Sequence, residues 1–375
     1  MVKLFVTCGS GLEPLLIEEL TSFGFSNLKP GFRGVYVEAP DFSAVYKINY
    51  LSRIATRVLL PIANFKVWDK KTLYKGAAKV DWSQYLDVKK TFSIDFSVSH
   101  KAFKNTLFAA QVVKDALCDH FREKTGVRPN VKTSNPQVQF HLFIYNDWAT
   151  ISLDTSGAPL HKRGYRMEGG EAPLQENLAA ALLTMAGYHK DEVLLDPCMG
   201  SGTFLVEAAM IATNTPPGYL REHWGFFSHP DFNQETWEAF KAQEDEKILP
   251  LAPKKLFGID KNKAQVQKAM ANTRLAGLHK GVAISEGDFR DFKPPVKPTM
   301  LIANPPYGKR LDEGDYLDRL YNELGDFYKA QAPAKGFILM PPDRSIGLKP
   351  TKRNVVFNGG IESRFNEYDL WDKED

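Results

Sequence analysis

"LLDPCMGSGTFLVEAAM", residues 194–210, joins an apolar stretch that ends in an acid to a glycine-containing loop and then to an apolar run. Asp196 stands at the expected end of a strand, Gly200 and Gly202 lie in the loop, and a helix is predicted to begin near Thr203. Glycines let a ligand approach the backbone closely, and a helix N-terminus offers free N–H groups to a carboxylate or phosphate. The stretch predicts a nucleotide-type site, and a tight strand-to-helix turn is the alternative.

Two later strands also end in acids. Asp260 closes "LFGID", and Asp288 follows the next strand in "SEGDF". Because open parallel sheets bind ligands at the carboxyl ends of their strands, we expect these acids at one edge of a sheet. In NAD-binding proteins the acid follows the glycines by about 20 residues, whereas Asp260 follows them by about 60. The intervening block, 215–240, is therefore expected to be an insertion beside the site, which disfavours a dehydrogenase. For Asp260 a helix cap ahead of Asn262 is the alternative.

A fourth strand runs into "LIANPPYGKR", residues 301–310. Pro305 and Pro306 have fixed φ angles and no N–H groups, so the loop is expected to be rigid with free carbonyl acceptors. Asn304 adds a side-chain oxygen, and Tyr307 adds an aromatic ring. Two acceptors and a stacking ring suit an exocyclic amino group on a planar base. The alternative is a purely structural end to the strand.

The 375 residues exceed the usual size of one core, so two or three domains are expected. Residues 1–172 hold 23 Lys and Arg against 16 Asp and Glu, and the remainder holds 25 against 29. The front half is thus basic by +7 and the back half acidic by −4, which together give the overall +3. A basic front half suggests contact with a polyanion, and solvated surface lysines are the alternative.

The secondary-structure patterns divide the chain further. Residues 1–50 are predicted to form strand, helix, strand and helix. In 91–100, Phe92, Ile94, Phe96 and Val98 alternate with polar residues, which indicates a half-buried strand. Residues 105–126 predict a helix that buries Leu107, Ala110, Val113, Leu117 and Phe121, followed by two strands that turn at Asn146 and Asp147.

From residue 156 a basic stretch rich in Gly and Pro is predicted to be a linker. Strands and helices then alternate, which predicts a mostly parallel sheet with helices on its faces. Asn358-Gly359 predicts a terminal hairpin. There is no uninterrupted apolar run of membrane-spanning length and no signal-peptide core, so a soluble cytoplasmic protein without membrane contact is expected. Cys8, Cys118 and Cys198 lack metal-ligand spacing, and no metal is expected.

These motifs together resemble a known family. Asp-Pro-x-x-Gly-Ser-Gly-Thr followed by Asn-Pro-Pro-Tyr resembles the signature of S-adenosylmethionine-dependent methyltransferases that act on amino nitrogens. "LHKRGYR" (160–166), "APLQENLAAALL" (172–183), "NPPYGKRL" (304–311) and "NGG" (358–360) resemble the THUMP-domain RNA methyltransferases. The resemblance is closest to the bacterial 23S rRNA guanine-N2 methyltransferases related to the N-terminal half of a bifunctional enzyme. Cys198 and Met199 depart from it, because the family usually has them in the opposite order.

The resemblance implies an α/β fold: a Rossmann-like methyltransferase domain at 173–375, preceded by a ferredoxin-like region at 1–50, a THUMP domain at 51–155 and a linker at 156–172. It implies S-adenosyl-L-methionine as cofactor, with Asp260 on its ribose and Asp288 on its adenine amino group. The implied cofactor-binding residues are Asp196, Pro197, Gly200, Ser201, Gly202, Thr203, Asp260, Asp288 and Asn304. The implied catalytic residues are Asn304, Pro305, Pro306 and Tyr307. Lys162, Arg163 and Arg166 are candidates for RNA phosphate contact, or for tying the linker to the next domain.

The expected function is methylation of a guanosine N2 amino group in structured RNA, either 23S rRNA or a large-subunit assembly intermediate. Three alternatives stay open: a tRNA guanine-N2 methyltransferase, an adenine-N6 methyltransferase acting on DNA or RNA, and a non-enzymatic RNA-binding assembly factor. The last predicts loss of the cofactor acids or of Asn304, yet all of them are present.

Overall fold

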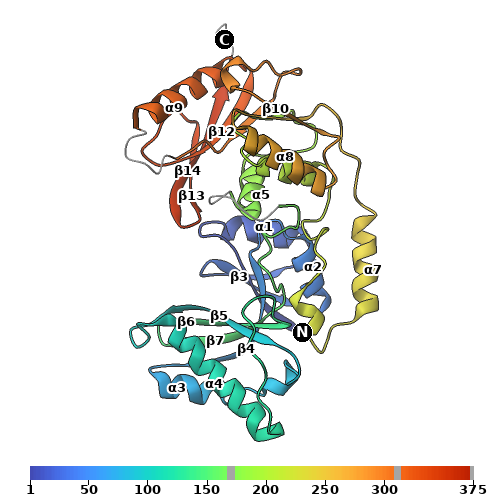
Figure 1. The fold of residues 1–375 in the computed structure, drawn as a ribbon, viewed down its shortest axis with the longest axis vertical. Coiled ribbons are helices and arrows are strands. Elements are labelled where there is room, and N and C mark those ends of the chain that lie inside the picture. The colour runs from blue at the N-terminus through green and yellow to red at the C-terminus, as the bar shows by residue number, and fades with distance from the viewer. Residues whose placement is uncertain (167–173, 308–313, 372–375) are drawn as a thin grey trace. The chain divides into compact units, whose positions relative to one another are not determined.

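The structure is a computed structural model that describes residues 1–166, 174–307 and 314–371. It contains two compact units (Figure 1). Unit 1 comprises Met1–Cys8, Leu16–Leu160 and Arg221–Ala242, and unit 2 comprises Gly9–Leu15, His161–Leu220 and Gln243–Asp375. Within the described ranges, every helix is too short or too polar to cross a membrane.

Unit 1 is built on a seven-stranded sheet of order β2-β3-β1-β4-β7-β6-β5. Its strands are β1 (Val2–Thr7), β2 (Asn27–Gly31), β3 (Gly34–Ala39), β4 (Arg57–Lys66), β5 (Phe92–Ser99), β6 (Val138–Tyr145) and β7 (Trp148–Asp154). Its helical elements include most of α1 (Glu13–Ser22), together with α2 (Ser43–Leu51), α3 (Lys70–Ala77), η1 (Trp82–Gln84) and α4 (Thr106–Thr125). Strand β4 pairs with β1 on one side and with β7 on the other. The predicted regions 1–50 and 51–155 therefore share one continuous sheet.

Most of the elements predicted after β4 are confirmed: the strand at 91–100, the helix at 105–126 and the two strands that follow it. Phe92 is buried in the core beneath α3 and α4, and the alternate apolar residues of β5 pack against that core. Asn105 caps α4 by accepting from the Phe108 N–H, and Gly126 ends the helix with φ at 73°. Leu107 does not face the core as predicted, because 51% of its surface is exposed in the first turn of α4.

Residues Arg221–Ala242 form part of unit 1. They contain η2 (Gly225–Ser228) and most of α7 (Gln234–Asp245). The ring of Phe226 lies 5.1 Å from that of Tyr46, and the ring of Trp237 lies 5.4 Å from that of Tyr50, between ring centroids. Both tyrosines belong to α2, so the segment buries its aromatic side chains against that helix. The sequence did not indicate this packing within unit 1, and the expected position of the block beside the glycine loop stays a prediction.

Unit 2 is built on a second seven-stranded sheet, of order β10-β9-β8-β11-β12-β14-β13. Its strands are β8 (Leu194–Asp196), β9 (Leu256–Asp260), β10 (Val282–Glu286), β11 (Met300–Ala303), β12 (Ala334–Met340), β13 (Lys352–Asn358) and β14 (Ile361–Leu370). Its helices include α5 (Glu176–Met185), α6 (Thr203–Ala212), α8 (Lys263–Leu275) and α9 (Gly314–Lys329), with a short η3 (Phe289–Asp291). The five strands β10, β9, β8, β11 and β12, which are neighbours in that order, are parallel to one another. Strand β14 runs antiparallel to β12 and β13.

This topology confirms the predicted Rossmann-like fold. The strand order reverses between β8 and β11, which is the place where open α/β sheets bind ligands. Alternate residues of the central strands face opposite layers: Phe257 and Ile259 pack with the apolar side of α9, whereas Gly258 faces α6. The terminal hairpin is also confirmed, because Gly359 and Gly360 form its turn with φ angles of 57° and 89°.

We predict that Gly258→Ala lowers the free energy of unfolding by about 1–3 kcal/mol, because an added methyl group overpacks the layer between β9 and α6. A Cβ at this position would lie 2.4 Å from Leu205 Cδ1 and 2.7 Å from Met199 Sδ. Urea denaturation measures the change. Ala283→Ser, at an exposed position of β10, is the control and should stay within about 0.5 kcal/mol of the parent. An equal stability of Gly258→Ala and the parent would contradict this packing.

Candidate functional site

The glycine loop begins directly at the end of β8. Asp196 is only 1% exposed, and its Oδ1 accepts from the backbone N–H of Cys198 at 3.1 Å. Gly200 and Gly202 have φ angles of 53° and 78°, in the left-handed region that other residues avoid. A Cβ built on Gly200 would meet no atom within 4 Å, so the loop is bordered by open space there. The loop leads into α6 at Thr203, as predicted.

Asp260 ties this loop to the neighbouring strand. Its Oδ2 accepts from the Gly200 N–H at 2.9 Å, and its Oδ1 accepts from the Asn262 N–H at 2.8 Å. The N-cap of α8 is Asn262, whose side chain accepts from Ala264 N–H at 3.0 Å. Asp260 is therefore not the helix cap that was the alternative, and it fixes the conformation of the loop instead.

Asp288 lies just beyond β10, the strand that pairs with β9. Its Oδ1 accepts from the backbone N–H of Arg290 at 3.0 Å and from the Arg290 Nε at 2.8 Å. These bonds hold the pKa of the Asp288 carboxyl below its usual range. Arg290 also pairs with Glu323 of α9 at 3.1 Å, so its guanidinium orients Asp288. Sequence reasoning missed Arg290, and the "DFR" spacing was the available signal.

Burial dominates the electrostatics of the glycine loop. It raises the pKa of the Asp196 carboxyl and the pKa of the Cys198 thiol well above their usual values. A thiol with a raised pKa is a poor nucleophile, so Cys198 is not activated for nucleophilic chemistry. The exchange of Cys198 and Met199 relative to the family pattern is accommodated by packing: Met199 is 5% exposed, and its N–H donates to the Ile259 carbonyl at 3.2 Å.

The Asn-Pro-Pro-Tyr loop emerges from β11, which lies beside β8 in the sheet. Asn304 is half-buried, and its Oδ1 is a buried acceptor without a hydrogen-bond partner among the described residues. Pro305 is buried, whereas Pro306 is exposed and its carbonyl accepts from the Tyr321 hydroxyl of α9 at 3.3 Å. Burial raises the pKa of the Tyr307 phenol. The rest of this motif, 308–313, lies outside the described residues.

The adjacent strands β9, β8 and β11 thus bring three predicted side chains to one sheet edge: Asp260, Asp196 and Asn304. This edge is the place at which the strand order reverses. The edge combines a glycine loop with open space beside it, a helix N-terminus, two carboxylates and an unsatisfied amide oxygen. Such a set can hold a nucleotide-like ligand and an amino group side by side.

The sequence matches three known domain families. Residues 3–59 match the RlmL ferredoxin-like domain, residues 69–154 match the THUMP domain, and residues 163–346 match the RMKL-like methyltransferase domain. The putative RNA methyltransferase slr0064 of Synechocystis sp. is 34% identical over 373 residues, which cover 98% of this chain and 96% of that protein. The chain belongs to the THUMP-domain RNA methyltransferases.

Other members of the family are longer. The ribosomal RNA large subunit methyltransferase K/L of Psychromonas ingrahamii is 38% identical over 377 residues, which cover 98% of this chain and 50% of that protein. The chain spans about half the length of the K/L relatives it matches. Among solved structures, a possible methylase from Clostridium difficile 630 superposes with a TM-score of 0.87 at 29% identity, covering 99% of this chain and 98% of that one. The putative methyltransferase SMU.472, complexed with SAH, also gives 0.87, at 27% identity and with the same coverage.

The structure corrects one predicted role of the family's "LHKRGYR" segment. Arg163 is 1% exposed, and its Nε lies 3.5 Å from Oε1 of Glu207, a fully buried residue of α6. The same carboxylate oxygen accepts from the Tyr165 hydroxyl at 3.0 Å. A guanidinium buried in this way cannot reach an RNA phosphate, so the predicted phosphate contact of Arg163 is wrong. Lys162 is exposed, and its contact with RNA stays a prediction.

Arg166 is engaged with the start of two helices. Its Nε donates to Glu176 of α5 at 2.8 Å, and its Nη2 donates to the Thr203 hydroxyl of α6 at 3.0 Å and to the Leu174 carbonyl at 2.9 Å. These contacts favour the alternative role, in which the segment is tied to the following domain. Because Thr203 directly follows Gly202, Arg166 also supports the glycine loop.

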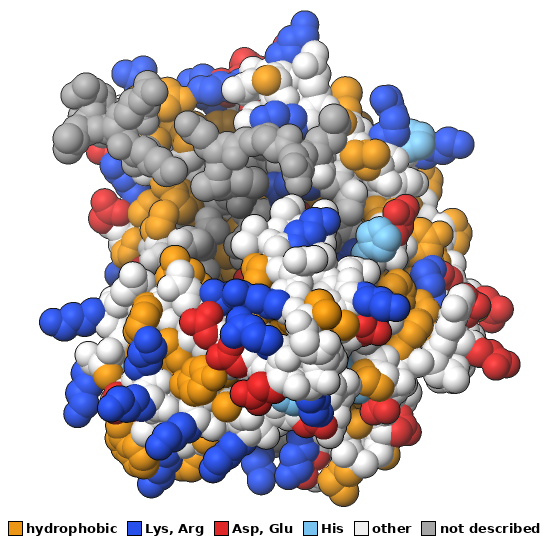
Figure 2. All heavy atoms as spheres, turned by 60° about the horizontal axis from the view of Figure 1, so that its bottom comes forward, with side chains coloured by type: hydrophobic (Ala, Val, Ile, Leu, Met, Phe, Trp, Pro, Cys, Tyr) orange, Lys and Arg blue, Asp and Glu red, His pale blue; other side chains and the backbone are white. Residues whose placement is uncertain are grey.

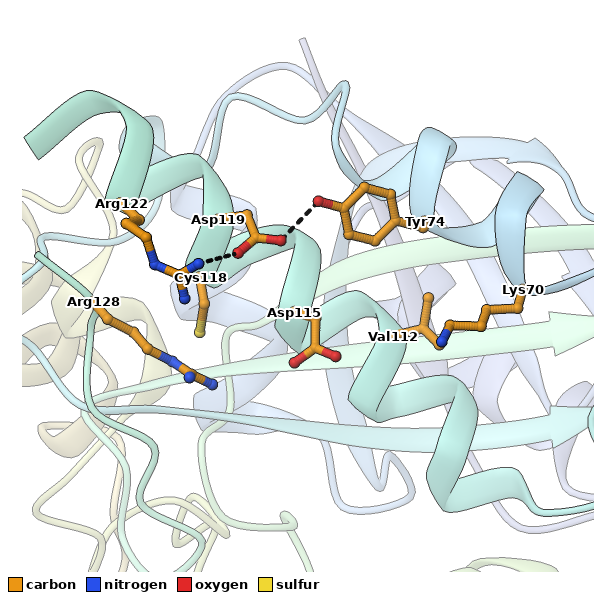
Figure 3. Close-up of a pocket in the computed structure, with 8 residues that line it drawn as sticks. All are labelled: Lys70, Tyr74, Val112, Asp115, Cys118, Asp119, Arg122 and Arg128. Carbon is orange, nitrogen blue, oxygen red and sulfur yellow. Dashed lines mark hydrogen bonds and ion pairs between the residues drawn. The ribbon is translucent and has the colours of Figure 1, made fainter. Parts of the chain in front are cut away.

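A separate cavity of about 360 Å³ lies in unit 1 between α3 and α4 (Figure 3). The carboxylate at its centre is already engaged: Asp119 accepts from the Tyr74 hydroxyl at 2.8 Å and pairs with Arg122 at 3.1 Å. We therefore assign it no ligand. Across the described ranges, no group of three or more His, Cys, Asp or Glu side chains is arranged to hold a metal ion.

We predict that Arg166→Ala lowers the free energy of unfolding by about 2 kcal/mol, because it leaves the 4%-exposed Glu176 carboxylate without its cation. Arg166→Lys should recover only part of the loss, since an ammonium cannot reproduce the fork of guanidinium contacts. Urea denaturation measures stability, and Lys162→Ala is the matched control. Normal stability of Arg166→Ala combined with weakened RNA binding would restore the phosphate role.

Proposed function

We propose that this chain is an S-adenosyl-L-methionine-dependent methyltransferase that methylates the exocyclic N2 amino group of a guanosine in 23S rRNA. The observation that carries the chemistry is the buried Asn304 Oδ1, an acceptor without a partner among the described residues, at the sheet edge that also holds Asp196 and Asp260. A buried acceptor left unpaired is costly, and a donor from a bound substrate would satisfy it. The names of the K/L relatives support a ribosomal RNA substrate.

The glycine loop fits the cofactor. The left-handed φ angles of Gly200 and Gly202 expose backbone, and the open space beside Gly200 leaves room for a ligand. Asp260 would accept from the ribose hydroxyls and Asp288 from the adenine amino group, as the family resemblance implies. The remaining contacts are assigned to Asp196, Pro197, Ser201, Thr203 and Asn304. When bound, the cofactor supplies a methyl group on a positively charged sulfonium.

The Asn-Pro-Pro-Tyr loop would prepare the amine. The lone pair of a guanine N2 amine is delocalised into the ring, so the amine is a weak nucleophile. Hydrogen bonds from its two N–H groups to Asn304 Oδ1 and to the Pro305 carbonyl favour a pyramidal nitrogen and stabilise its developing positive charge. Pro306 keeps the loop rigid, and Tyr307 stacks on the base. The base must first leave its helix, as in other base-modifying enzymes.

The substrate assignment rests on unit 1 and on the relatives. Residues 1–172 carry a net charge of +7, which suits a polyanion. The matching THUMP and RlmL ferredoxin-like domains occupy this basic part of the chain. We propose 23S rRNA or a large-subunit assembly intermediate as the partner, and the cytoplasm, where ribosomes are assembled, as the location.

Asn304→Ala is expected to reduce methyl transfer by about 100- to 1,000-fold, because the variant loses a hydrogen bond to charge that develops in the transition state. Transfer of a labelled methyl group to rRNA measures activity, and calorimetry with S-adenosylhomocysteine measures cofactor binding. RNA affinity should stay within about twofold of the parent, because the contact strengthens mainly during the reaction.

Two variants sharpen this test. Asn304→Asp keeps an acceptor oxygen and should retain more activity than Asn304→Ala. Asn322→Ala removes an exposed asparagine of α9 and should methylate like the parent. Normal methylation by Asn304→Ala would refute the assigned role of the amide oxygen.

A further inference from the structure

Unit 1 carries a continuous row of side chains drawn from three places in the sequence. The ring of Phe32, in the turn between β2 and β3, lies 5.7 Å from the ring of Tyr145 at an interplanar angle of 10°. Tyr145 is the last residue of β6 and pairs across the hairpin with Trp148. Trp148 pairs in turn with Lys66 of β4, whose Nζ lies 5.7 Å from the indole centroid. We call Phe32, Tyr145, Trp148 and Lys66 the aromatic row.

The aromatic row faces solvent. Phe32, Tyr145 and Trp148 are 62%, 47% and 48% exposed. Their strand neighbours Ile144 and Ala149 point the other way and are fully buried in the core beneath α3 and α4. Because successive side chains of a strand alternate between faces, the rings are not part of that core. Adjacent exposed rings of this size on a folded unit indicate a binding surface.

The row is held in place before any partner binds. Asn146 adopts a left-handed φ of 51° in the turn after Tyr145, and the Asp147 carbonyl accepts from the Val67 N–H at 2.8 Å. Phe143 lies beside Tyr145 on the same face of β6, with 6.4 Å between ring centroids and 17° between ring planes. Rings that are ordered in advance lose little conformational freedom on binding.

The charge around the row is positive. Lys66 lies at one end, and the exposed Arg33 follows Phe32 at the other. Asp147, the acid in the turn between β6 and β7, is engaged by a histidine: its Oδ1 lies 3.3 Å from His100 Nε2. Figure 2, which brings the lower part of Figure 1 forward, shows many Lys and Arg side chains among hydrophobic ones, in keeping with the net charge of +7 on residues 1–172. Stacking rings interleaved with cations are the features that bind single-stranded nucleic acid.

We propose that the aromatic row binds unpaired RNA nucleotides, with bases stacking on Phe32, Tyr145 and Trp148 and phosphates contacting Lys66 and Arg33. This inference rests on the proposed function, because it assumes that the substrate is RNA. It adds that unit 1 recognises a single-stranded segment of that RNA in addition to any helical shape. Double-stranded RNA presents no free base face and should not depend on the rings.

Fluorescence anisotropy with two fluorescein-labelled RNAs tests the proposal: an unstructured single strand and a blunt-ended duplex whose strands have the same length. Tyr145→Ala and Trp148→Ala should each weaken single-strand binding by about five- to a hundredfold, the effect of losing one stacked base. Duplex binding should change less than about twofold. Tyr145→Phe, which keeps the ring, should bind like the parent, whereas Tyr145→Leu, which keeps only apolar bulk, should bind like Tyr145→Ala.

Phe108→Ala is the matched control, because Phe108 is a 40%-exposed ring with Lys70 5.2 Å above it but lies on α4, outside the row. It should leave both affinities unchanged. Thermal melting verifies that each variant is folded, and Tyr145→Leu keeps the test decisive if an alanine variant does not fold.

The proposal is overturned if the alanine variants bind the single strand like the parent, if Tyr145→Leu does so, or if both RNAs lose affinity equally. It is also overturned if the row mediates self-association, seen in sedimentation as a dimer that Tyr145→Ala abolishes. Failure of the proposed function is distinct, since the parent would then transfer no methyl group to RNA whatever the row binds.

Discussion

The hydrogen bond between the Gly200 N–H and Asp260 Oδ2 joins the ends of two neighbouring strands. It holds the glycine loop in a left-handed conformation from which α6 starts, and it keeps one carboxylate oxygen of Asp260 at the sheet edge. Arg166 supports the same loop from the other side through Thr203. With the loop fixed, Asn304 of the adjacent strand faces a preorganised edge, which is the condition for aligning an amine with a methyl donor.

Much of unit 2 could be predicted from sequence, because each of its signals is local. Apolar strands that end in Asp196 and Asp260, glycines at left-handed positions and an Asn-Gly hairpin act over a few residues. The structure places the predicted side chains at one edge because parallel strands all point the same way.

Other features depend on contacts between distant parts of the chain. Strand β4 was not identified from sequence, because Pro61 and an irregular register interrupt its alternation, although β4 joins both halves of the unit 1 sheet. The segment Arg221–Ala242 belongs to unit 1 through aromatic contacts with α2 that no local pattern shows. Arg163 belongs to a basic segment of the kind that contacts RNA at a surface. Only its burial against Glu207 reveals a structural role.

We propose that the chain methylates a guanine amino group in ribosomal RNA. A decisive measurement is incubation with a radiolabelled methyl donor and, separately, with rRNA, tRNA and DNA, followed by digestion to nucleosides. We expect label in N2-methylguanosine from 23S rRNA. Label found only in DNA, or on the N6 amino group of adenine, would contradict it.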